Sequence, residues 1–323
     1  MKCIRPIKAS QNSDGDLVYN IKKAIPGLVP WEFPCRKCLP CRLNIAREKA
    51  IRATHEAKMH EDNIFLTLTY DDAHIGDNKL NYLDFQLFMK RLREKVTRNV
   101  TDKELKDKLH IGYMVTGEYG EQTKRQHWHA ILFNYHPNDA KLKYQSKTGD
   151  LVFTSETLQK LWGKGSIEFG TVTMDSASYV ARYAAKKLIH GKDEEHDYHP
   201  IHKTSSKHAI GKKWIEKHWK HTFTHGYVVL PNGEKASIPR YYVDWLKKNK
   251  EHEYEKYITT VREHSIKKAE TKARKEEIEY LTSVMDRMSR WNNGEYTPPI
   301  TKAKVKLTIL NSKFKQLQQH LKL

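Results

Sequence analysis

Two histidines, His127 and His129, flank Trp128 in a run of residues that is typical of a β-strand. Because side chains alternate faces along a strand, both imidazoles point to one face and the tryptophan points to the other. Two imidazoles roughly 7 Å apart along a strand can share one ion. We expect the third ligand to be Glu118, across a hairpin from the histidines, with Glu121 as the alternative.

A site of two imidazoles and a carboxylate, with positions left open, suits Mg²⁺ or Mn²⁺ and a phosphate oxygen. Two histidines one residue apart are a short motif, and ordinary histidines on a half-buried strand are its commoner explanation. The metal hypothesis therefore depends on what accompanies the pair.

Two tyrosines, Tyr179 and Tyr183, follow at a spacing of four residues. On a helix this spacing places both hydroxyls on one side, and Lys186 shares that face. A phenol with a pKa near 10 is a weak nucleophile at neutral pH, and a metal ion that polarises a phosphodiester would supply the missing activation. Lys186 and Lys187 would stabilise charge on the phosphate. Alone, such a tyrosine pair more often serves packing.

Both motifs occur in order within one predicted domain, and their combination gives them weight. A metal beside paired tyrosines is what an enzyme needs to cut a DNA strand and stay attached to its 5′ end. The 323 residues include 58 Lys and Arg against 39 Asp and Glu, a formal charge of +19. This surplus is typical of proteins that bind nucleic acid. We expect Arg182, Lys124 and Arg125 to contact DNA.

The elements around these motifs predict an α+β fold, in which a central antiparallel sheet carries helices on one face. The short connection between the two strands that flank the candidate metal site argues against a parallel sheet. The predicted strands are residues 64–70, 111–116, 127–134 and 166–172. The predicted helices are residues 43–60, residues 82–96 and a third, capped by Asp175 or Ser176, that ends near residue 188.

Three regions are predicted along the chain. Residues 1–60 form a cysteine-containing segment, irregular over its first 30 residues, and a basic helix. Residues 61–190 form the nuclease core, and residues 191–323 form a basic loop, a hairpin and a helical C-terminal region.

Within the last region, residues 190–225 are rich in Lys and His and predict a basic loop that binds phosphates. The turn at residues 231–233 predicts a hairpin. Residues 241–248 and 253–290 predict helices, and no structure is predicted from residue 297 onward.

Four cysteines, Cys3, Cys35, Cys38 and Cys41, are candidates for a structural Zn²⁺ site, because thiolates suit zinc in a reducing compartment. Reduced buried thiols and a redox or cluster role remain open, since the tight spacing of the last three cysteines is awkward for one ion.

The sequence has neither an N-terminal secretory signal nor an apolar run of the roughly 20 residues that span a membrane, so we expect a cytoplasmic protein. Residues 163–166 lack the spacing of an ATP-binding P-loop. DNA unwinding and synthesis would therefore depend on a host helicase and DNA polymerase.

The histidine pair followed by a two-tyrosine helix resembles the HUH endonuclease superfamily, whose fold is a ferredoxin-like or RRM-like sheet. A closer similarity is to the replication initiators of gokushovirus-type microviruses. The blocks that carry it are residues 35–42, 65–72, 117–120, 127–134, 176–187 and 238–242.

This resemblance implies a nuclease that acts on single-stranded or cruciform origin DNA, with His127, His129 and Glu118 as metal ligands and Tyr179 and Tyr183 as nucleophiles. One tyrosine would keep the 5′ end as a phosphotyrosine and free a 3′-OH primer, and the second would resolve the regenerated junction. The alternatives are a relaxase or transposase with the same chemistry, and a non-catalytic, zinc-stabilised DNA-binding protein.

Overall fold

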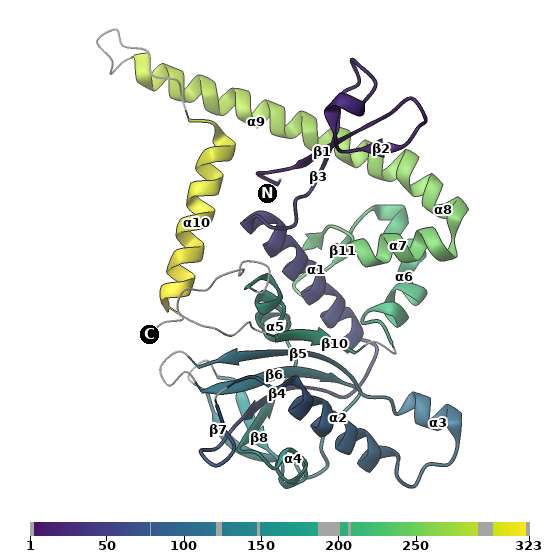
Figure 1. Cartoon of the computed structure of the whole chain (residues 1–323), viewed down its shortest axis with the longest axis vertical. Helices are drawn as coiled ribbons and strands as arrows, with labels where there is room; N and C mark the ends of the chain where they lie inside the picture. The colour runs from purple at the N-terminus through teal and green to yellow at the C-terminus, as the bar shows by residue number, and fades with distance from the viewer. Residues whose placement is uncertain are drawn as a thin grey trace. The chain divides into compact units, whose positions relative to one another are not determined.

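Figure 1 shows the computed structural model of the chain, which divides into two compact units. Unit 1 comprises Met1–Gly120 and Arg125–Lys217, and unit 2 comprises Glu121–Lys124 and His218–Leu323. The structure describes residues 3–77, 79–120, 125–146, 149–186, 201–205, 208–289 and 300–320, and only the backbone of residues 182–186, 286–289 and 317–320.

Unit 1 is built around a seven-stranded antiparallel sheet of order β10-β5-β6-β4-β9-β8-β7, so the α+β class is confirmed. The strands are β4 (Asn63–Thr69), β5 (Gly112–Tyr119), β6 (Gln126–Phe133), β7 (Lys141–Gln145), β8 (Leu151–Thr154), β9 (Ile167–Gly170) and β10 (Ile201–Thr204). The four strands predicted from the sequence correspond to β4, β5, β6 and β9. The sequence does not predict β7 or β8, because β7 is fully exposed and shows no alternation of burial.

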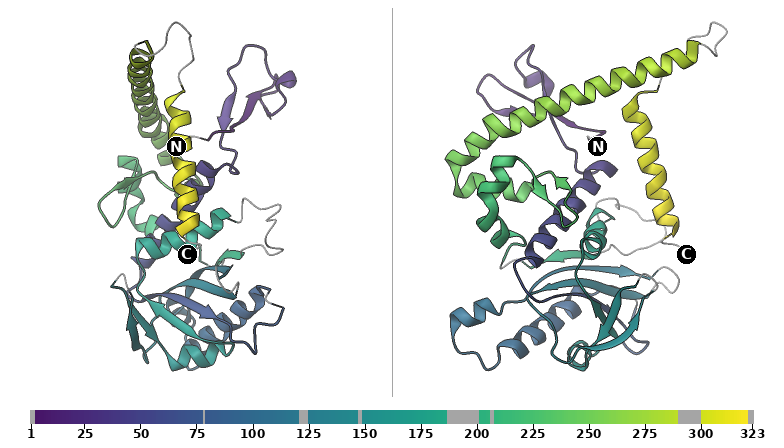
Figure 2. Two further views of the ribbon diagram at one scale, coloured as in Figure 1. Left: turned by 90° about the vertical axis from the view of Figure 1, so that its left-hand side faces the viewer. Right: turned by 180° about the vertical axis from the view of Figure 1, so that it is seen from behind.

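Helices cover both faces of this sheet, and the expectation of one covered face is wrong (Figures 1 and 2). The helices of unit 1 are α1 (Leu39–Ala57), α2 (Tyr82–Thr97), α3 (Lys103–Lys108), α4 (Glu156–Trp162), α5 (Met174–Lys186) and the start of α6 (Lys212–His225). Strand β6 explains the second layer. Trp128 and Leu132 enter a core with α2 and α4, while Ile131 and Phe133 enter a core with α1 and α5.

Small side chains let α1 and α5 approach each other closely. Ala46, Ala50 and Ala53 of α1 and Ala177 and Ala181 of α5 are all buried in the second core. Alanine also has the highest helix propensity, so the same residues favour both the helices and their close packing. The helix that carries the predicted nucleophiles is therefore held chiefly by α1.

Helix α5 is capped by a residue that the sequence analysis does not single out. The hydroxyl of Thr173 accepts a hydrogen bond from the Ser176 amide (3.1 Å), and the Ser176 hydroxyl accepts one from the Thr173 amide (2.8 Å). This reciprocal pair is a capping box. The expectation that Asp175 or Ser176 is the cap is wrong, because both lie within the first turn.

The N-terminal segment forms a three-stranded sheet of order β2-β1-β3, from β1 (Ile7–Gln11), β2 (Leu17–Val18) and β3 (Trp31–Phe33), with a 3-10 turn η1 (Ile21–Lys23). The expectation of an irregular first 30 residues is therefore wrong. The side-chain oxygen of Asn12 accepts hydrogen bonds from the amides of Asp14 and Asp16, which closes the turn between β1 and β2. The strands are short and largely exposed, so their sequences lack the alternation that marks a strand.

Unit 2 contains the end of α6, the predicted hairpin of β11 (Val228–Val229) and β12 (Lys235–Ala236), and a series of helices. These are α7 (Arg240–Asn249), α8 (Glu251–Lys256), the π-helical turn η2 (Tyr257–Arg262), α9 (Glu263–Ser289) and α10 (Lys302–His320). The basic loop expected up to residue 225 is wrong where β10 and α6 lie. Ile215, Trp219, Thr222 and Phe223 repeat at helical spacing, a signal diluted by the surrounding Lys and His.

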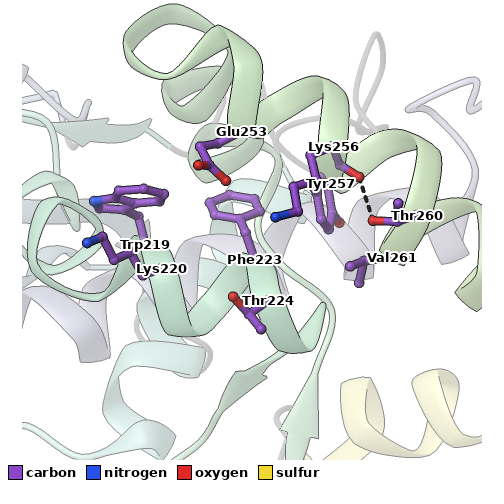
Figure 3. A pocket seen from close by; sticks show the side chains of 9 residues that line it. All are labelled: Trp219, Lys220, Phe223, Thr224, Glu253, Lys256, Tyr257, Thr260 and Val261. Atoms are coloured by element: carbon purple, nitrogen blue, oxygen red, sulfur yellow. Dashed lines mark hydrogen bonds between the residues drawn. The ribbon is translucent and has the colours of Figure 1, made fainter.

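Figure 3 shows a pocket of about 290 Å³ in unit 2. Trp219 and Phe223 of α6 line one part of it, and Tyr257 packs edge-on against Phe223 with ring centres 4.9 Å apart. None of the predicted site residues lines this pocket.

Candidate active site

Three of the predicted ligands converge at the adjoining ends of β5 and β6. In the register of these strands Glu118 lies opposite His127, and His129 is two residues further along β6. Oε1 of Glu118 is 3.1 Å from Nε2 of His127 and 2.9 Å from Nε2 of His129. All three ligand atoms lie within 4.8 Å of one another, so one cation can contact all of them.

Hydrogen bonds on the far side of each imidazole fix its orientation. Nδ1 of His127 lies 3.2 Å from the carbonyl oxygen of Arg125, and Nδ1 of His129 lies 3.0 Å from the hydroxyl of Thr67. A carbonyl can only accept, so Nδ1 of His127 carries the proton. Ligand histidines in metal sites are held in this way, with the remaining nitrogen free for the ion.

The donor set fits a divalent cation on physical grounds. In neutral His127 the proton on Nδ1 leaves a lone pair on Nε2, which faces a carboxylate oxygen of Glu118 at 3.1 Å. Two acceptors at this distance repel each other unless a proton or a metal ion lies between them. Burial lowers the pKa of His129, although the charge of Glu118 opposes the effect. A neutral imidazole is the form that binds a metal.

Tyr179 of α5 reaches the same carboxylate. Its hydroxyl donates a hydrogen bond of 2.8 Å to Oε1 of Glu118, and its ring packs edge-on against His129 with centres 5.1 Å apart. Phe65 of β4 stacks on His129 and also meets the edge of Tyr179. A predicted nucleophile thus lies directly beside the predicted ligands.

The other predicted residues differ in what the structure says of them. Tyr183, Arg182 and Lys186 lie on α5, where only the backbone is described, and Lys187, Lys124 and Glu121 lie outside the described residues. Arg125 donates to the carbonyl of Tyr70 (3.0 Å) and forms an ion pair with Asp72. These bonds give Arg125 a place in the local fold, and its carbonyl orients His127.

Thr67 and Phe65 are site residues that the sequence reasoning misses. Both lie on β4, and Thr67 is opposite His129 in the register of β4 with β6. The only available signal is that residues 65–72 form one of the blocks of family resemblance. Alternation places Phe65 and Thr67 on one face, but it does not say which strand lies next to β4.

A groove of about 380 Å³ opens beside the site. Phe65 and Thr67 line it together with Gly170 of β9 and Asp175 and Ser176 in the first turn of α5. Because α5 also carries Tyr179 one turn later, a strand of DNA lying in this groove would pass close to the tyrosine hydroxyl.

Gly117 is required for the close approach of β5 to the tryptophan of β6. A Cβ atom at this position would lie 2.6 Å from a ring carbon of Trp128. The indole nitrogen of Trp128 donates to the Tyr70 hydroxyl at 3.0 Å, on the opposite face from the histidines. Gly117 therefore lets Glu118 and Trp128 take opposite faces of the same strand pair.

The four cysteines form a second cluster, away from the histidines in the chain. Their sulfur atoms all lie within 4.8 Å of one another. The amide of Cys38 holds the pKa of Cys35 at about 6, whereas burial raises the pKa of Cys41 to about 12. The protein thus has two groups that could hold metal ions.

Comparisons with known proteins agree with this arrangement. Residues 63–188, which span the sheet strands β4 to β9 and α5, match a family model of replication-associated proteins of the ORF2 type. The chain is 55% identical to the replication-associated protein VP4 of Bdellovibrio phage phiMH2K over 323 residues, which is the whole of both chains. It belongs to the replication-associated proteins of microviruses.

Two other microviral replication-associated proteins are more distant. ORF4 of Chlamydia phage 1 is 33% identical over 227 residues, which is 68% of this chain and 54% of that protein. ORF2 of Spiroplasma virus 4 is 34% identical over 208 residues, or 58% of this chain and 62% of that protein. No solved structure matches this replication-associated protein.

The family expected from the sequence motifs is therefore confirmed, and with it a role in phage DNA replication. In the part of this replication-associated protein that the structure describes, no helix is long and apolar enough to cross a membrane.

Proposed function

We propose that this replication-associated protein initiates rolling-circle replication by nicking origin DNA through a tyrosine. The observation that carries the proposal is the 2.8 Å hydrogen bond from the Tyr179 hydroxyl to Glu118, whose Oε1 also faces both histidines. A nucleophile and a set of metal ligands that share one atom are arranged for attack on a phosphate held at the metal.

The residues that would hold the ion are Glu118, His127 and His129. Mg²⁺ or Mn²⁺ bound to them would polarise the scissile phosphodiester and orient it toward the tyrosine. Thr67 and the Arg125 carbonyl would keep both Nε2 atoms directed at the ion. Lys186 and Lys187 are proposed to stabilise charge on the phosphate, and Arg182, Lys124 and Arg125 to contact the DNA.

In the first step the Tyr179 oxygen attacks the origin phosphorus. The new phosphotyrosine bond forms as the bond to the 3′ oxygen breaks, so the 5′ end stays on the protein. The phenolic proton leaves, and Oε1 of Glu118 is the acceptor that it already contacts. The departing oxygen gains a proton and becomes the 3′-OH primer.

Tyr183 follows Tyr179 by four residues on α5, about one helical turn. We propose that it attacks the regenerated junction after one round, and that the released 3′-OH closes the circle by displacing Tyr179. Two nucleophiles on one helix allow this transfer without dissociation. Lacking a P-loop, the protein would rely on a host helicase and polymerase in the host cytoplasm.

The test uses single-stranded oligonucleotides tiled across the phage's own genome, with Mn²⁺. Wild-type protein should form a covalent adduct on a denaturing gel with a few of them, and adduct formation should stop with EDTA. Tyr179→Phe combined with Tyr183→Phe should form none. The matched control is Tyr19→Phe combined with Tyr144→Phe, two exposed tyrosines of unit 1.

An adduct that persists in the Tyr179 and Tyr183 double variant would disprove the mechanism. Binding without any Mn²⁺-dependent cleavage by the wild-type protein would instead favour a non-catalytic DNA-binding role. Cleavage restricted to transfer or transposition junctions would favour the relaxase or transposase alternative.

A further inference from the structure

The N-terminal sheet of unit 1 lacks a hydrophobic core of its own. Among residues 3–34, only Ala9 and Ser10 are buried, while Trp31 is 51% exposed and Ile21 is 67% exposed. A sheet this small cannot be stable on so little buried apolar area. Small structures of this kind are usually stabilised by a disulfide or a metal ion.

The four cysteines join this sheet to α1. Cys3 precedes β1 and Cys35 follows β3, while Cys38 is the residue before α1 and Cys41 lies in its first turn. The cluster therefore holds both ends of the sheet against the start of the helix. None of the four cysteines forms a disulfide.

Their geometry matches a single tetrahedral ion. A zinc–sulfur bond of about 2.3 Å places the sulfurs of a tetrahedral site about 3.8 Å apart. The sulfurs of Cys3 and Cys38 are 3.8 Å apart, and all four lie within 4.8 Å of one another. A four-iron cluster is itself several ångströms wide and would hold its thiolates farther apart.

The surroundings suit the negative charge of four thiolates. The sulfur of Cys3 accepts a hydrogen bond from the Cys35 amide, and the sulfur of Cys35 accepts one from the Cys38 amide, both at 3.3 Å. The positive end of the α1 dipole points at the cluster. Arg42, which is 8% exposed, lies one residue beyond Cys41 in the first turn of the same helix.

We propose that Cys3, Cys35, Cys38 and Cys41 bind one structural Zn²⁺ that anchors the N-terminal sheet to α1. The site is separate from the nuclease centre and uses thiolates alone, so it takes a different metal from the Glu118 site. Because α1 packs on α5, the zinc also fixes the helix on whose far side Tyr179 lies.

Metal analysis of the purified full-length protein tests the site. Wild-type protein should contain about one equivalent of zinc, and Cys38→Ser and Cys3→Ser should each lose at least nine-tenths of it. The matched control is His127→Ala combined with His129→Ala, which should keep the zinc. Wild-type protein without stoichiometric zinc, iron in its place, or zinc retained in both cysteine variants would overturn the proposal.

Cobalt and hydrogen exchange give evidence that does not depend on a variant that folds. Wild-type protein refilled with Co²⁺ should show the intense visible bands of a tetrahedral four-thiolate site, and their absence would count against it. After zinc is removed by a chelator, amide exchange in residues 3–41 should accelerate at least tenfold, while β4 and β6 stay protected. Unchanged exchange in residues 3–41 would refute the anchoring role, whether or not the protein nicks DNA.

Discussion

The Tyr179 hydroxyl and Oε1 of Glu118 are joined by a hydrogen bond of 2.8 Å, and that same oxygen lies 2.9 Å from Nε2 of His129. One atom thus faces both the proposed nucleophile and a proposed metal ligand. An ion bound to Glu118 would compete for the lone pairs that now hold the phenolic proton. Metal binding and release of the Tyr179 proton are therefore coupled through a single carboxylate.

Tyr179→Phe should abolish first-strand cleavage, by at least about 1,000-fold, since removal of a nucleophile leaves only binding contributions. The ring that packs against His129 remains in this variant, so Mn²⁺ binding should be unchanged. The rate of adduct formation is the measurement, and Tyr19→Phe is the control. If Tyr179→Phe forms adduct at the wild-type rate, Tyr183 makes the first attack instead.

Glu118→Gln should raise the Mn²⁺ concentration for half-maximal cleavage by about 10- to 100-fold, because the site loses its only charged ligand. The amide oxygen can still accept from Tyr179, which separates loss of charge from loss of the hydrogen bond. Glu168→Gln on β9 of the same sheet is the matched control. An unchanged Mn²⁺ dependence would remove Glu118 from the ligand set.

Thr67→Val should weaken Mn²⁺ binding about 10- to 100-fold without unfolding the sheet. Valine has the same shape and a high strand propensity, but it cannot hold Nδ1 of His129. Thr69→Val, two residues along β4 on the same face, is the control. The Mn²⁺ affinity is read by calorimetry, and equal affinities for the two variants would show that the Thr67 hydroxyl does not orient the ligand.

Tyr70→Phe should cost about 1–3 kcal/mol of unfolding free energy near neutral pH. The buried Tyr70 hydroxyl accepts from Trp128 and donates to Asp84, both at 3.0 Å, and phenylalanine leaves both partners without it. The denaturant midpoint measures the loss, with Tyr19→Phe as the control. A loss below the control's would mean that solvent replaces the hydroxyl.

The same variant carries a pH signature. Burial raises the pKa of Tyr70, so the folded protein keeps a proton that the unfolded chain releases near pH 10. Stability that Tyr70 provides is thus fully present below pH 10 and is lost as the pH rises above it, by up to about 1.4 kcal/mol per pH unit. Tyr70→Phe should lack this contribution, so the two stability curves should converge above pH 10. Parallel curves would contradict it.

The sequence predicts the central strands well and the edges poorly. In β4 and β6 apolar residues alternate or run together because both faces are buried, and this pattern survives in the sequence. The edge strand β7 is exposed along its length, and its Lys and Gln residues are indistinguishable from a loop. Helix α6 is missed for a related reason, since its single apolar face lies among Lys and His residues.

The candidate site divides in the same way. Alternation along β6 and a hairpin register suffice to bring Glu118 to His127. Thr67 comes from a strand some 60 residues earlier, and only tertiary pairing places it against His129. The capping role of Thr173 is local but ambiguous, because Thr173, Asp175 and Ser176 are all good capping residues.

The alternation along β6 also sets how this protein can change in evolution. The histidines occupy one face and Trp128 the other, so the metal ligands and the core share one strand. A single inserted or deleted residue between Gln126 and Phe133 would exchange the faces of all that follow. Such a change would bury imidazoles and expose indole together. Substitutions can thus adjust this strand gradually, whereas length variation there is closed to the lineage and must accumulate in its loops.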